Sequence, residues 1–193
     1  MQKIQAQTNA QRSAQTRRAL VVAARSLFVE KGFASTTTPE LVERAGLTRG
    51  ALYHHFRDKG EVLHSVLEEE AREVAEEIEK AAPTNASPVD ALRGGSVAYL
   101  NAMAFPGRTR LLLIEGPAAL GAARMAAIDE GHAAASLRAG LEEAMPGHHV
   151  AALTNLLSAS FDRAALDIEG GGEKDAIRAA MLFLIDRVVT SPS

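Results

Sequence analysis

The chain has 193 residues, enough for one domain or two small ones, and 47% of them are hydrophobic, which is sufficient for a packed core. Only 4% are aromatic and none is cysteine, so alanine and leucine must fill most of the core, which favours helices and excludes disulfides and thiolate chemistry. Residues 1–15 lack the apolar core of a signal peptide, and no uncharged apolar stretch reaches the ~20 residues of a membrane span. We therefore expect a soluble, cytoplasmic protein without a membrane partner.

The net charge of −3 conceals an asymmetry along the chain. Residues 1–60 contain ten Lys or Arg and four acids, a net charge of +6, whereas residues 61–193 contain 11 bases and 20 acids, a net charge of −9. A basic segment followed by an acidic one suggests that only the N-terminal part contacts a polyanion such as nucleic acid. The alternative is a chance distribution of solvated charges.

The first predicted helix spans residues 16–31. Apolar side chains recur in this segment at helical spacing, at Leu20, Val21, Ala24, Leu27 and Phe28. Gly32 provides the signal that ends the helix. Residues 1–15 are basic and polar, and we expect them to form a flexible arm.

The second predicted helix spans about residues 39–45, and its start has two possible registers. In one, Thr38 is the N-cap and Pro39 the first helical residue. In the other, Thr37 is the N-cap and the Glu40 side chain bonds back to it. The sequence leaves both registers open.

A third helix over residues 49–55 follows closely. Gly46 is suited to the left-handed end of the preceding helix, and Thr48 is a good N-cap for this one. A helix of seven residues is unstable alone, so Leu52 and Phe56 must dock it onto other helices. Two short helices joined by a tight glycine-containing turn are typical of a helix-turn-helix.

A long fourth helix is predicted to begin after Asp58, which is followed three residues later by Glu61 as in a capping box, and to end near Ala82. Its many glutamates are expected to form a solvated face: Glu68, Glu69, Glu70, Glu73, Glu76, Glu77 and Glu79.

The segment at residues 83–88, PTNASP, is the clear linker in the chain. We therefore expect a helix-turn-helix domain over residues 16–60, a connecting helix over 61–82 and a second helical domain over 83–193.

The second domain is also predicted to be helical, because no strand alternation persists and no internal repeat is visible. Its expected helices cover residues 88–104, 107–114, 118–145, 148–169 and 174–190. Their breaks fall at Pro106-Gly107, Gly116-Pro117, Pro146-Gly147 and Gly170-Gly171-Gly172. The last helix is apolar nearly all round, which suggests that a second copy of the protein covers part of it. The predicted fold class is all-α.

Residues 49–55 would present a polar outer face when Leu52 points inward. Arg49 can donate two hydrogen bonds to guanine, Gly50 allows the backbone to approach DNA closely, and Ala51 can lie against a thymine methyl. Tyr53, His54 and His55 offer further groups for bases or phosphates, and Lys59 adds a cation at the start of the fourth helix. In the alternative interpretation Gly50 is merely tolerated, Tyr53 packs, and the histidines cap the helix or face solvent.

The stretch GFASTTTPELVERAGLTRGALYHHFRDKGEVL resembles the DNA-binding segment of the TetR family of bacterial transcriptional regulators over roughly residues 14–65. The shared elements are a TT pair, the pattern AG-x-[TS]-x-G-x-[LIV]-Y-x-H-F and a following lysine. The resemblance implies phosphate contacts from Thr38, Thr48, Tyr53, His55 and Lys59. It implies base contacts from Arg49, Gly50 and His54. Gly60 departs from the family pattern, which usually has a better helix former there.

For the second half, the resemblance implies a helical ligand-binding and dimerisation domain. The dimer would form as a four-helix bundle from the last two long helices, and a two-fold dimer should bind a palindromic operator in double-stranded DNA. Candidate effector-lining residues are Tyr99, Met103, Phe105, Leu112, Met125 and Phe161, with ordinary core packing as the alternative. Candidate dimerisation residues are Leu153, Leu157, Phe161, Ile177, Met181, Leu184 and Val188.

Other chemistry is weakly indicated. Arg108, Arg110 and Glu115 could fix a polar ligand group, although exposed charge is the simpler explanation. The histidines 132, 148 and 149 do not form a convincing metal set, and we expect no metal and no cofactor. No hydrolase or metalloprotease motif is present, and the acids at 129, 130, 162, 167 and 169 could act in acid–base catalysis only if buried together.

The expected function is therefore that of a homodimeric, ligand-responsive repressor that a small-molecule effector releases from its operator. The alternatives are an effector-free DNA-binding regulator controlled by a protein partner and, third, a helical enzyme.

Overall fold

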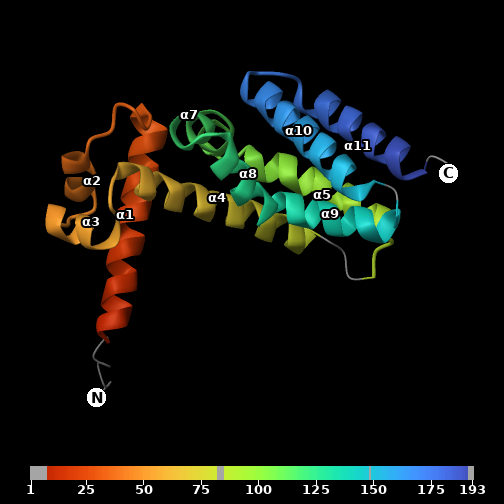
Figure 1. Cartoon of the computed structure of the whole chain (residues 1–193). Coiled ribbons are helices and arrows are strands. Elements are labelled where there is room, and N and C mark those ends of the chain that lie inside the picture. The colour runs from red at the N-terminus through yellow and green to blue at the C-terminus, as the bar shows by residue number, and fades with distance from the viewer. Residues whose placement is uncertain (1–7, 82–84, 148, 191–193) are drawn as a thin grey trace, which may run out of the picture. The chain divides into compact units, whose positions relative to one another are not determined.

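The computed structural model describes residues 8–81, 85–147 and 149–190, and every regular element in these ranges is helical (Figure 1). In chain order the elements are α1 (Asn9–Lys31), α2 (Thr38–Arg44), α3 (Arg49–His55), α4 (Lys59–Ala81), α5 (Pro88–Met103), α6 (Arg108–Arg110), η1 (Leu111–Glu115), α7 (Gly116–Leu120), α8 (Ala122–Glu130), α9 (Ala133–Ala144), α10 (Val150–Glu169) and α11 (Lys174–Thr190). The all-α prediction is confirmed. Within the described ranges, none of these helices combines the length and the apolar character that crossing a membrane requires.

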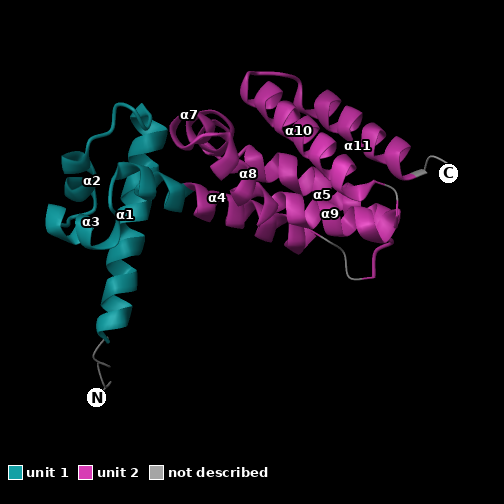
Figure 2. Ribbon diagram, viewed as in Figure 1, with its two compact units in different colours: residues 1–66 teal, residues 67–193 magenta. Residues whose placement is uncertain are grey.

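The chain divides into two compact units, residues 1–66 and 67–193 (Figure 2). The division falls inside α4, so this helix contributes its first turns to one unit and the remainder to the other. Val62, Leu63 and Val66 are buried within the first unit, which explains why it extends past the predicted domain limit at residue 60.

Helix α1 begins at Asn9, earlier than the predicted start at Thr16. The Thr8 hydroxyl accepts a hydrogen bond from Gln11 N at 3.2 Å, and Thr8 N donates to Gln11 Oε1 at 2.8 Å. This capping box stabilises the first two turns of α1, which are polar and lack the apolar periodicity that predicts a helix. Residues 9–15 are thus helical rather than part of an arm, and residues 1–7 of the expected arm lie outside the described residues.

The start of α2 uses the register in which Thr37 is the N-cap. Glu40 Oε2 accepts hydrogen bonds from Thr37 N at 2.8 Å and from Thr37 Oγ1 at 2.7 Å. Arg44, at the other end of α2, binds both carboxylate oxygens of Glu30 on α1, at 2.7 and 2.9 Å. These contacts fix the two helices against each other above a shared apolar core.

Gly46 ends the α2 segment in the left-handed conformation, with φ of 65°, as predicted. Leu47 N then donates to Val42 O at 2.8 Å, and Thr48 begins α3 two residues after the glycine. The predicted helix-turn-helix geometry is therefore present in the first unit.

The second unit packs α5, α9, α10 and α11 around one apolar core. The buried residues of this core are Leu92, Leu100, Leu141, Leu157, Phe161, Ala164, Met181 and Ile185. The prediction of one helix over residues 118–145 is wrong. The chain breaks at Gly121, whose φ is 84°, and again at Gly131 and His132, giving three shorter helices.

The predicted break at Gly116-Pro117 is also wrong, because the chain remains helical from α6 through α7. Gly116 N donates to Leu111 O across the π-helical turn η1. Pro117 lies in the first turn of α7, where the missing N–H is tolerated. A side chain at Gly116 would meet Met125 Sδ at 2.8 Å and Leu67 Cδ1 at 3.0 Å, so the glycine permits close packing here.

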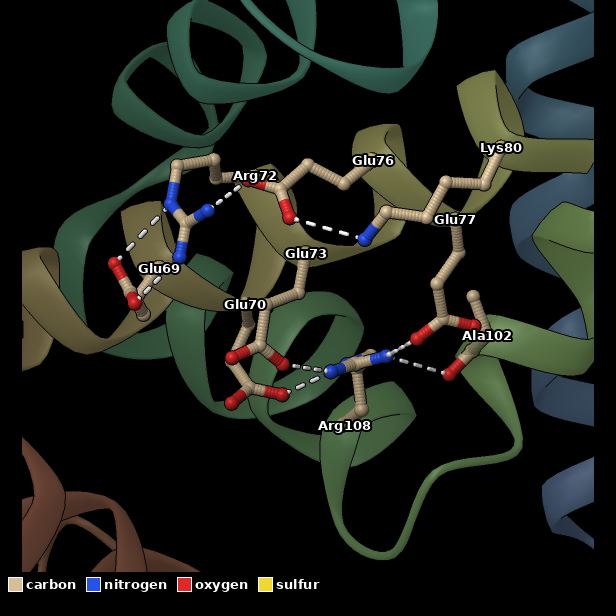
Figure 3. A network of polar contacts seen from close by, with 9 residues as sticks. All are labelled: Glu69, Glu70, Arg72, Glu73, Glu76, Glu77, Lys80, Ala102 and Arg108. Atoms are coloured by element: carbon tan, nitrogen blue, oxygen red, sulfur yellow. Dashed lines mark hydrogen bonds and ion pairs between the residues drawn. The ribbon is translucent and has the colours of Figure 1, made fainter.

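Arg108 is buried, contrary to the expectation that it is exposed or binds a ligand (Figure 3). Its Nε donates to Glu70 Oε2 at 2.8 Å and its Nη2 to Glu73 Oε2 at 2.5 Å, while Nη1 reaches Glu77 at 3.4 Å and donates to Ala102 O at 2.9 Å. Glu70 is only 2% exposed, so the predicted solvated face of α4 is wrong at this position. Three glutamates of α4 hold the start of α6 through one guanidinium group.

Candidate nucleic-acid interface and ligand cavity

Helix α3 is fixed by its apolar side and its N-cap. Leu52 is 1% exposed and Phe56 4%, so both anchor the helix in the core of the first unit. Thr48 Oγ1 accepts a hydrogen bond from Ala51 N at 3.2 Å. The remaining side chains of α3 are therefore held in a defined direction although the helix has only seven residues.

The outer face of α3 consists of the residues that the sequence placed there. Arg49, Gly50, Tyr53 and His54 are all exposed. The Arg49 guanidinium carbon lies 6.0 Å from the centre of the Tyr53 ring, and Tyr53 is 49% exposed despite its size. A cation and a phenol hydroxyl thus stand side by side on a surface that the fold leaves uncovered.

Packing among the described residues does not require a glycine at position 50. A Cβ at this position would meet only Thr48 Oγ1, at 3.8 Å, which is ordinary contact. Since glycine is unfavourable in a helix, its presence needs another reason. Close approach of an external backbone or base remains our prediction.

The two histidines differ in environment. His54 is exposed, whereas His55 is half-buried and its ring lies 5.1 Å from that of His54. Burial lowers the pKa of His55, and the charges of His54 and Arg17 lower it further. His55 is thus favoured as a neutral hydrogen-bonding group rather than as a cation.

Lys59 lies at the start of α4, as expected, but its side chain binds groups within the chain. Its Nζ donates to Phe33 O and Thr36 O, both at 2.7 Å, and lies 4.3 Å from the centre of the Phe33 ring. Burial lowers the pKa of Lys59. The ammonium group therefore fixes the turn between α1 and α2. A phosphate contact from Lys59, as predicted, would have to use the same ammonium group. Thr38, half-buried at the start of α2, lies just beyond the same turn.

The second unit contains two adjoining cavities, each of about 430 Å³. Tyr99 on α5 lines both, and Phe161 lies in the first with its ring centre 5.4 Å from that of Tyr99. Met103, Leu112 and Met125 line the second cavity.

Phe105, the sixth predicted lining residue, belongs to neither cavity lining. It is 48% exposed, and the Arg108 guanidinium carbon lies 4.8 Å from its ring centre. Phe105 lies beyond the end of α5, in the turn that leads to α6.

Two of the five acids that the sequence analysis named, Asp129 and Asp162, face the second cavity together, although the sequence did not indicate that they would meet. Tyr99 Oη donates to Asp162 Oδ1 at 2.7 Å, and Ser158 Oγ donates to Asp129 Oδ2 at 2.9 Å. Burial raises the pKa of the Asp162 carboxyl, the hydrogen bond from Tyr99 lowers it, and the charge of Asp129 raises it again. The only hint in the sequence is that Ser158 and Asp162, four residues apart, share one side of α10 next to the apolar Phe161.

Other charged candidates pair within the chain. Arg110 Nε lies 3.0 Å from Glu115 Oε1, and His132 Nε2 lies 3.1 Å from Glu68 Oε2. His148 lies outside the described residues, and among the described ones no group of three potential ligands could hold a metal ion.

The predicted dimerisation residues fall into two groups. Leu157, Phe161 and Met181 are buried in the core of their own unit, so they cannot meet a partner directly. The prediction for these three does not fit the structure, because the apolar stripe of each helix faces inward. Leu153, Ile177 and Val188 are half-buried against the same core, and Leu184 is exposed. Leu156 and Phe183, which were not predicted, are 66% and 61% exposed.

Together these features define a helical protein with an N-terminal helix-turn-helix unit and a second unit that contains a cavity. Residues 20–66 match the model of the bacterial regulatory proteins of the tetR family, and residues 89–191 match the model of the tetracyclin repressor-like C-terminal domain. The chain belongs to the TetR family, as the resemblance predicted. This is a family of regulatory proteins, which confirms that the chain is not an enzyme.

Individual relatives agree with this assignment. The chain is 33% identical over 104 residues to the HTH-type transcriptional regulator AcrR of Shigella flexneri, which covers 53% of this chain and 48% of AcrR. It is 31% identical over 98 residues to the HTH-type transcriptional regulator TtgR of Pseudomonas putida, covering 50% of this chain and 46% of TtgR. The chain thus spans about half the length of these curated relatives.

Solved structures extend the likeness in fold to nearly the whole chain. The regulator FadR from Bacillus subtilis, in complex with stearoyl-CoA, has a TM-score of 0.72 over 91% of this chain and 99% of its own, at 16% sequence identity.

Proposed function

We propose that this protein is a transcriptional regulator that binds a palindromic operator as a homodimer and is released from it by a small-molecule effector. The observation that carries the proposal is the uncovered face of α3, where Arg49, Gly50, Tyr53 and His54 are held outward by a buried Leu52. This face lies in the basic part of the chain, with a net charge of +6 over residues 1–60. A recognition helix needs such a rigid and polar surface for the major groove.

Dimerisation is supported by the outward faces of the last two helices. Most of the exposed residues there are small or apolar: Ala151, Ala152, Asn155, Leu156 and Ala159 on α10, and Ala176, Ala179, Ala180, Phe183 and Leu184 on α11. Charged residues are exposed nearer the helix ends, namely Arg163 and Glu169 on α10 and Asp175 and Arg187 on α11. Small residues allow two helices to approach closely, and apolar surface of this kind favours association. We therefore assign the interface to these faces, with Leu184 retained from the sequence prediction.

Control by a small molecule is supported by the two cavities of the second unit, which together provide room for a ligand of ordinary size. FadR, which has the same fold, binds stearoyl-CoA in its solved structure. A second unit without room for a ligand would have favoured control by a protein partner. The effector would release DNA by binding more tightly to a conformation in which the two α3 helices are wrongly spaced. As a regulator of transcription, the protein would act in the cytoplasm.

The test is selection of bound sequences from random duplexes with the full-length protein, followed by titration of the selected duplex. We expect a palindromic consensus whose half-sites lie about one DNA turn, ~34–36 Å, or a multiple of it apart. Arg49→Ala should weaken binding to the consensus by about 1–3 kcal/mol and relax base preference at one position of each half-site.

Arg138→Ala is the matched control, because it removes the same charge from an exposed helical position in the second unit. It should leave operator affinity unchanged. Binding that is weak, salt-sensitive and independent of sequence would contradict the proposal, as would equal affinities for the wild type and Arg49→Ala.

A further inference from the structure

The two cavities of the second unit adjoin each other, and we refer to them together as the chamber. Both are lined by Tyr99, Ala133, Ala134 and Ser158. The first cavity has aromatic and aliphatic walls that include Leu92 and Phe161. An apolar ligand body of moderate size would fit there, against the ring of Phe161 and next to that of Tyr99.

The second cavity differs in its polar groups. Asp129 and Asp162 face it from α8 and α10, and neither carboxylate is paired with a basic side chain among the described residues. The nearest polar partners are hydroxyls, those of Ser158 and Tyr99. Two half-buried carboxylates without a counter-ion are unfavourable unless a proton or a cation neutralises them.

The sign of the charge is uniform over the whole chamber. The acidic lining residues are Glu79, Glu143, Asp129, Glu130 and Asp162, and among the described residues no lysine, arginine or histidine lines either cavity. An anionic ligand would therefore meet only like charges, and such juxtaposition is strongly disfavoured. A neutral apolar ligand would leave both carboxylates unpaired. A ligand with a cationic group satisfies the apolar and the acidic parts of the chamber at once.

We propose that the effector is a lipophilic cation, an amine or quaternary ammonium group attached to an aromatic or aliphatic body, whose charge lies between Asp129 and Asp162 and whose body crosses Tyr99 into the first cavity. The regulatory role of this ligand rests on the proposed function, whereas the binding site itself depends only on the residues of the chamber.

Each side chain then has a definite task. Asp162 and Asp129 bind the cation, and their hydroxyl partners Tyr99 and Ser158 hold the carboxylates in place. The rings of Tyr99 and Phe161 provide aromatic faces for the body and, near the charge, a cation–π contact. Burial already raises the pKa of Asp162, and a bound cation would reverse that shift by stabilising the ionised form.

The experiment compares three probes with the same body: biphenyl-4-methylamine, biphenyl-4-methanol and biphenyl-4-carboxylate. Binding to the full-length dimer is measured by isothermal titration calorimetry in the absence of DNA. The amine, cationic at neutral pH, should bind at least about tenfold more tightly than the carboxylate, with the alcohol between them.

Variants then locate the charge. Asp162→Asn and Asp129→Asn should each weaken binding of the amine by about tenfold while changing the affinity of the alcohol little. Glu169→Gln is the control, because it removes one exposed carboxylate from α10 outside both cavities. Far-UV circular dichroism confirms that each variant is folded.

Equal affinities for the three probes, no binding of the amine, or an amine preference that survives both asparagine substitutions would overturn the proposal. These outcomes are separate from failure of the proposed function, which concerns DNA. A protein that selects a palindromic operator but ignores the amine refutes the ligand class alone. A protein that binds the amine at Asp129 and Asp162 but selects no operator supports this site and refutes the regulator.

Discussion

The two units of the molecule place their functional groups in opposite ways. The face of α3 comes from one continuous stretch, residues 48–55, whose direction is set by a local cap and two buried side chains. The chamber of the second unit is lined from α4, α5, α8, α9 and α10, which are up to about a hundred residues apart in sequence. A surface that meets a polymer can be built from local structure, whereas an enclosed ligand site needs several helices around it.

The two units also differ in where their acidic side chains lie. In the first unit the acids Glu30 and Glu40 are on the surface and paired with Arg44 and Lys31. In the second unit Glu70 is buried with Arg108, and Asp129 and Asp162 face a cavity. We therefore expect the buried Arg108–Glu70 pair of the second unit to contribute more to stability than the exposed pairs of the first unit, which variants can test.

The largest expected effect is that of Arg108→Ala. The substitution leaves the Glu70 carboxylate, 2% exposed, without its guanidinium partner, and breaking a buried pair in this way costs about 3–5 kcal/mol of unfolding free energy. Arg44→Ala in the first unit breaks a solvent-exposed pair and should destabilise the protein far less, because solvent screens such pairs. Urea unfolding followed by circular dichroism measures both.

A double variant sharpens this comparison. Arg108→Met combined with Glu70→Gln leaves no unpaired charge in the buried position and should recover part of the lost stability. Glu77→Gln changes the longest and most exposed of the Arg108 pairs, at 3.4 Å, and should have little effect. If Arg108→Ala cost no more than Glu77→Gln, the buried network would not have the stabilising role assigned to it.

The next effect separates stability from DNA binding at Gly50. Because a Cβ there meets nothing closer than 3.8 Å, Gly50→Ala should fit the fold and stabilise it by up to about 1 kcal/mol. If the helix backbone approaches DNA closely, the same methyl group should weaken operator binding by about tenfold or more. Thermal unfolding and operator titration of the same sample give the two quantities.

The control for Gly50 is Gly95→Ala in α5, where a Cβ would lie 3.4 Å from Ile78 Cγ2, an ordinary contact. It removes a helical glycine from the second unit and should leave operator affinity unchanged. Operator affinity that is equally unaffected by Gly50→Ala would show that Gly50 is merely tolerated, and the explanation for this glycine would be lost.

The difference between local structure and contacts between distant segments also decides what the sequence could predict. The positions of Leu52, Gly46 and Thr48 follow from local spacing and capping, so the third helix was correct at both ends. Arg108 could not be placed from its neighbours, because its partners Glu70, Glu73 and Glu77 are more than 30 residues away and look like a solvated face. Asp129 and Asp162 were equally indistinct, since only the packing of α8 and α10 brings them to one cavity. The early start of α1 was missed because its first turns are polar and depend on the Thr8 cap.

The smallest expected effect is a difference between the units in their response to acid. Hydrogen bonds from Arg44 and Ser26 lower the pKa of Glu30 to about 2, and those from Lys31 and Thr37 lower the pKa of Glu40 to about 2. Because both values lie below the ordinary 4.5, the stability that these pairs provide is present above pH 4.5 and is lost as the pH falls from there to about 2. Asp162, whose pKa is raised by burial, behaves oppositely: its contribution is greatest at low pH and is lost as the pH rises through its folded value.

The chain offers a probe for each unit, since it has no tryptophan and its two tyrosines are Tyr53 in the first unit and Tyr99 in the second. In a Tyr53→Phe background the fluorescence of Tyr99 reports the unfolding of the second unit alone, and comparison with the wild type gives the unfolding of the first unit.

We expect the paired variant Glu30→Gln with Glu40→Gln to be slightly less stable near pH 6 and to lose less stability than the wild type between pH 4.5 and 2. Glu43→Gln, on the exposed side of α2, should retain the wild-type loss in that interval. An unchanged slope in the paired variant would mean that the surface pairs of the first unit are too weakly formed in solution to oppose acid, and the difference between the units would then rest on the buried charges of the second unit alone.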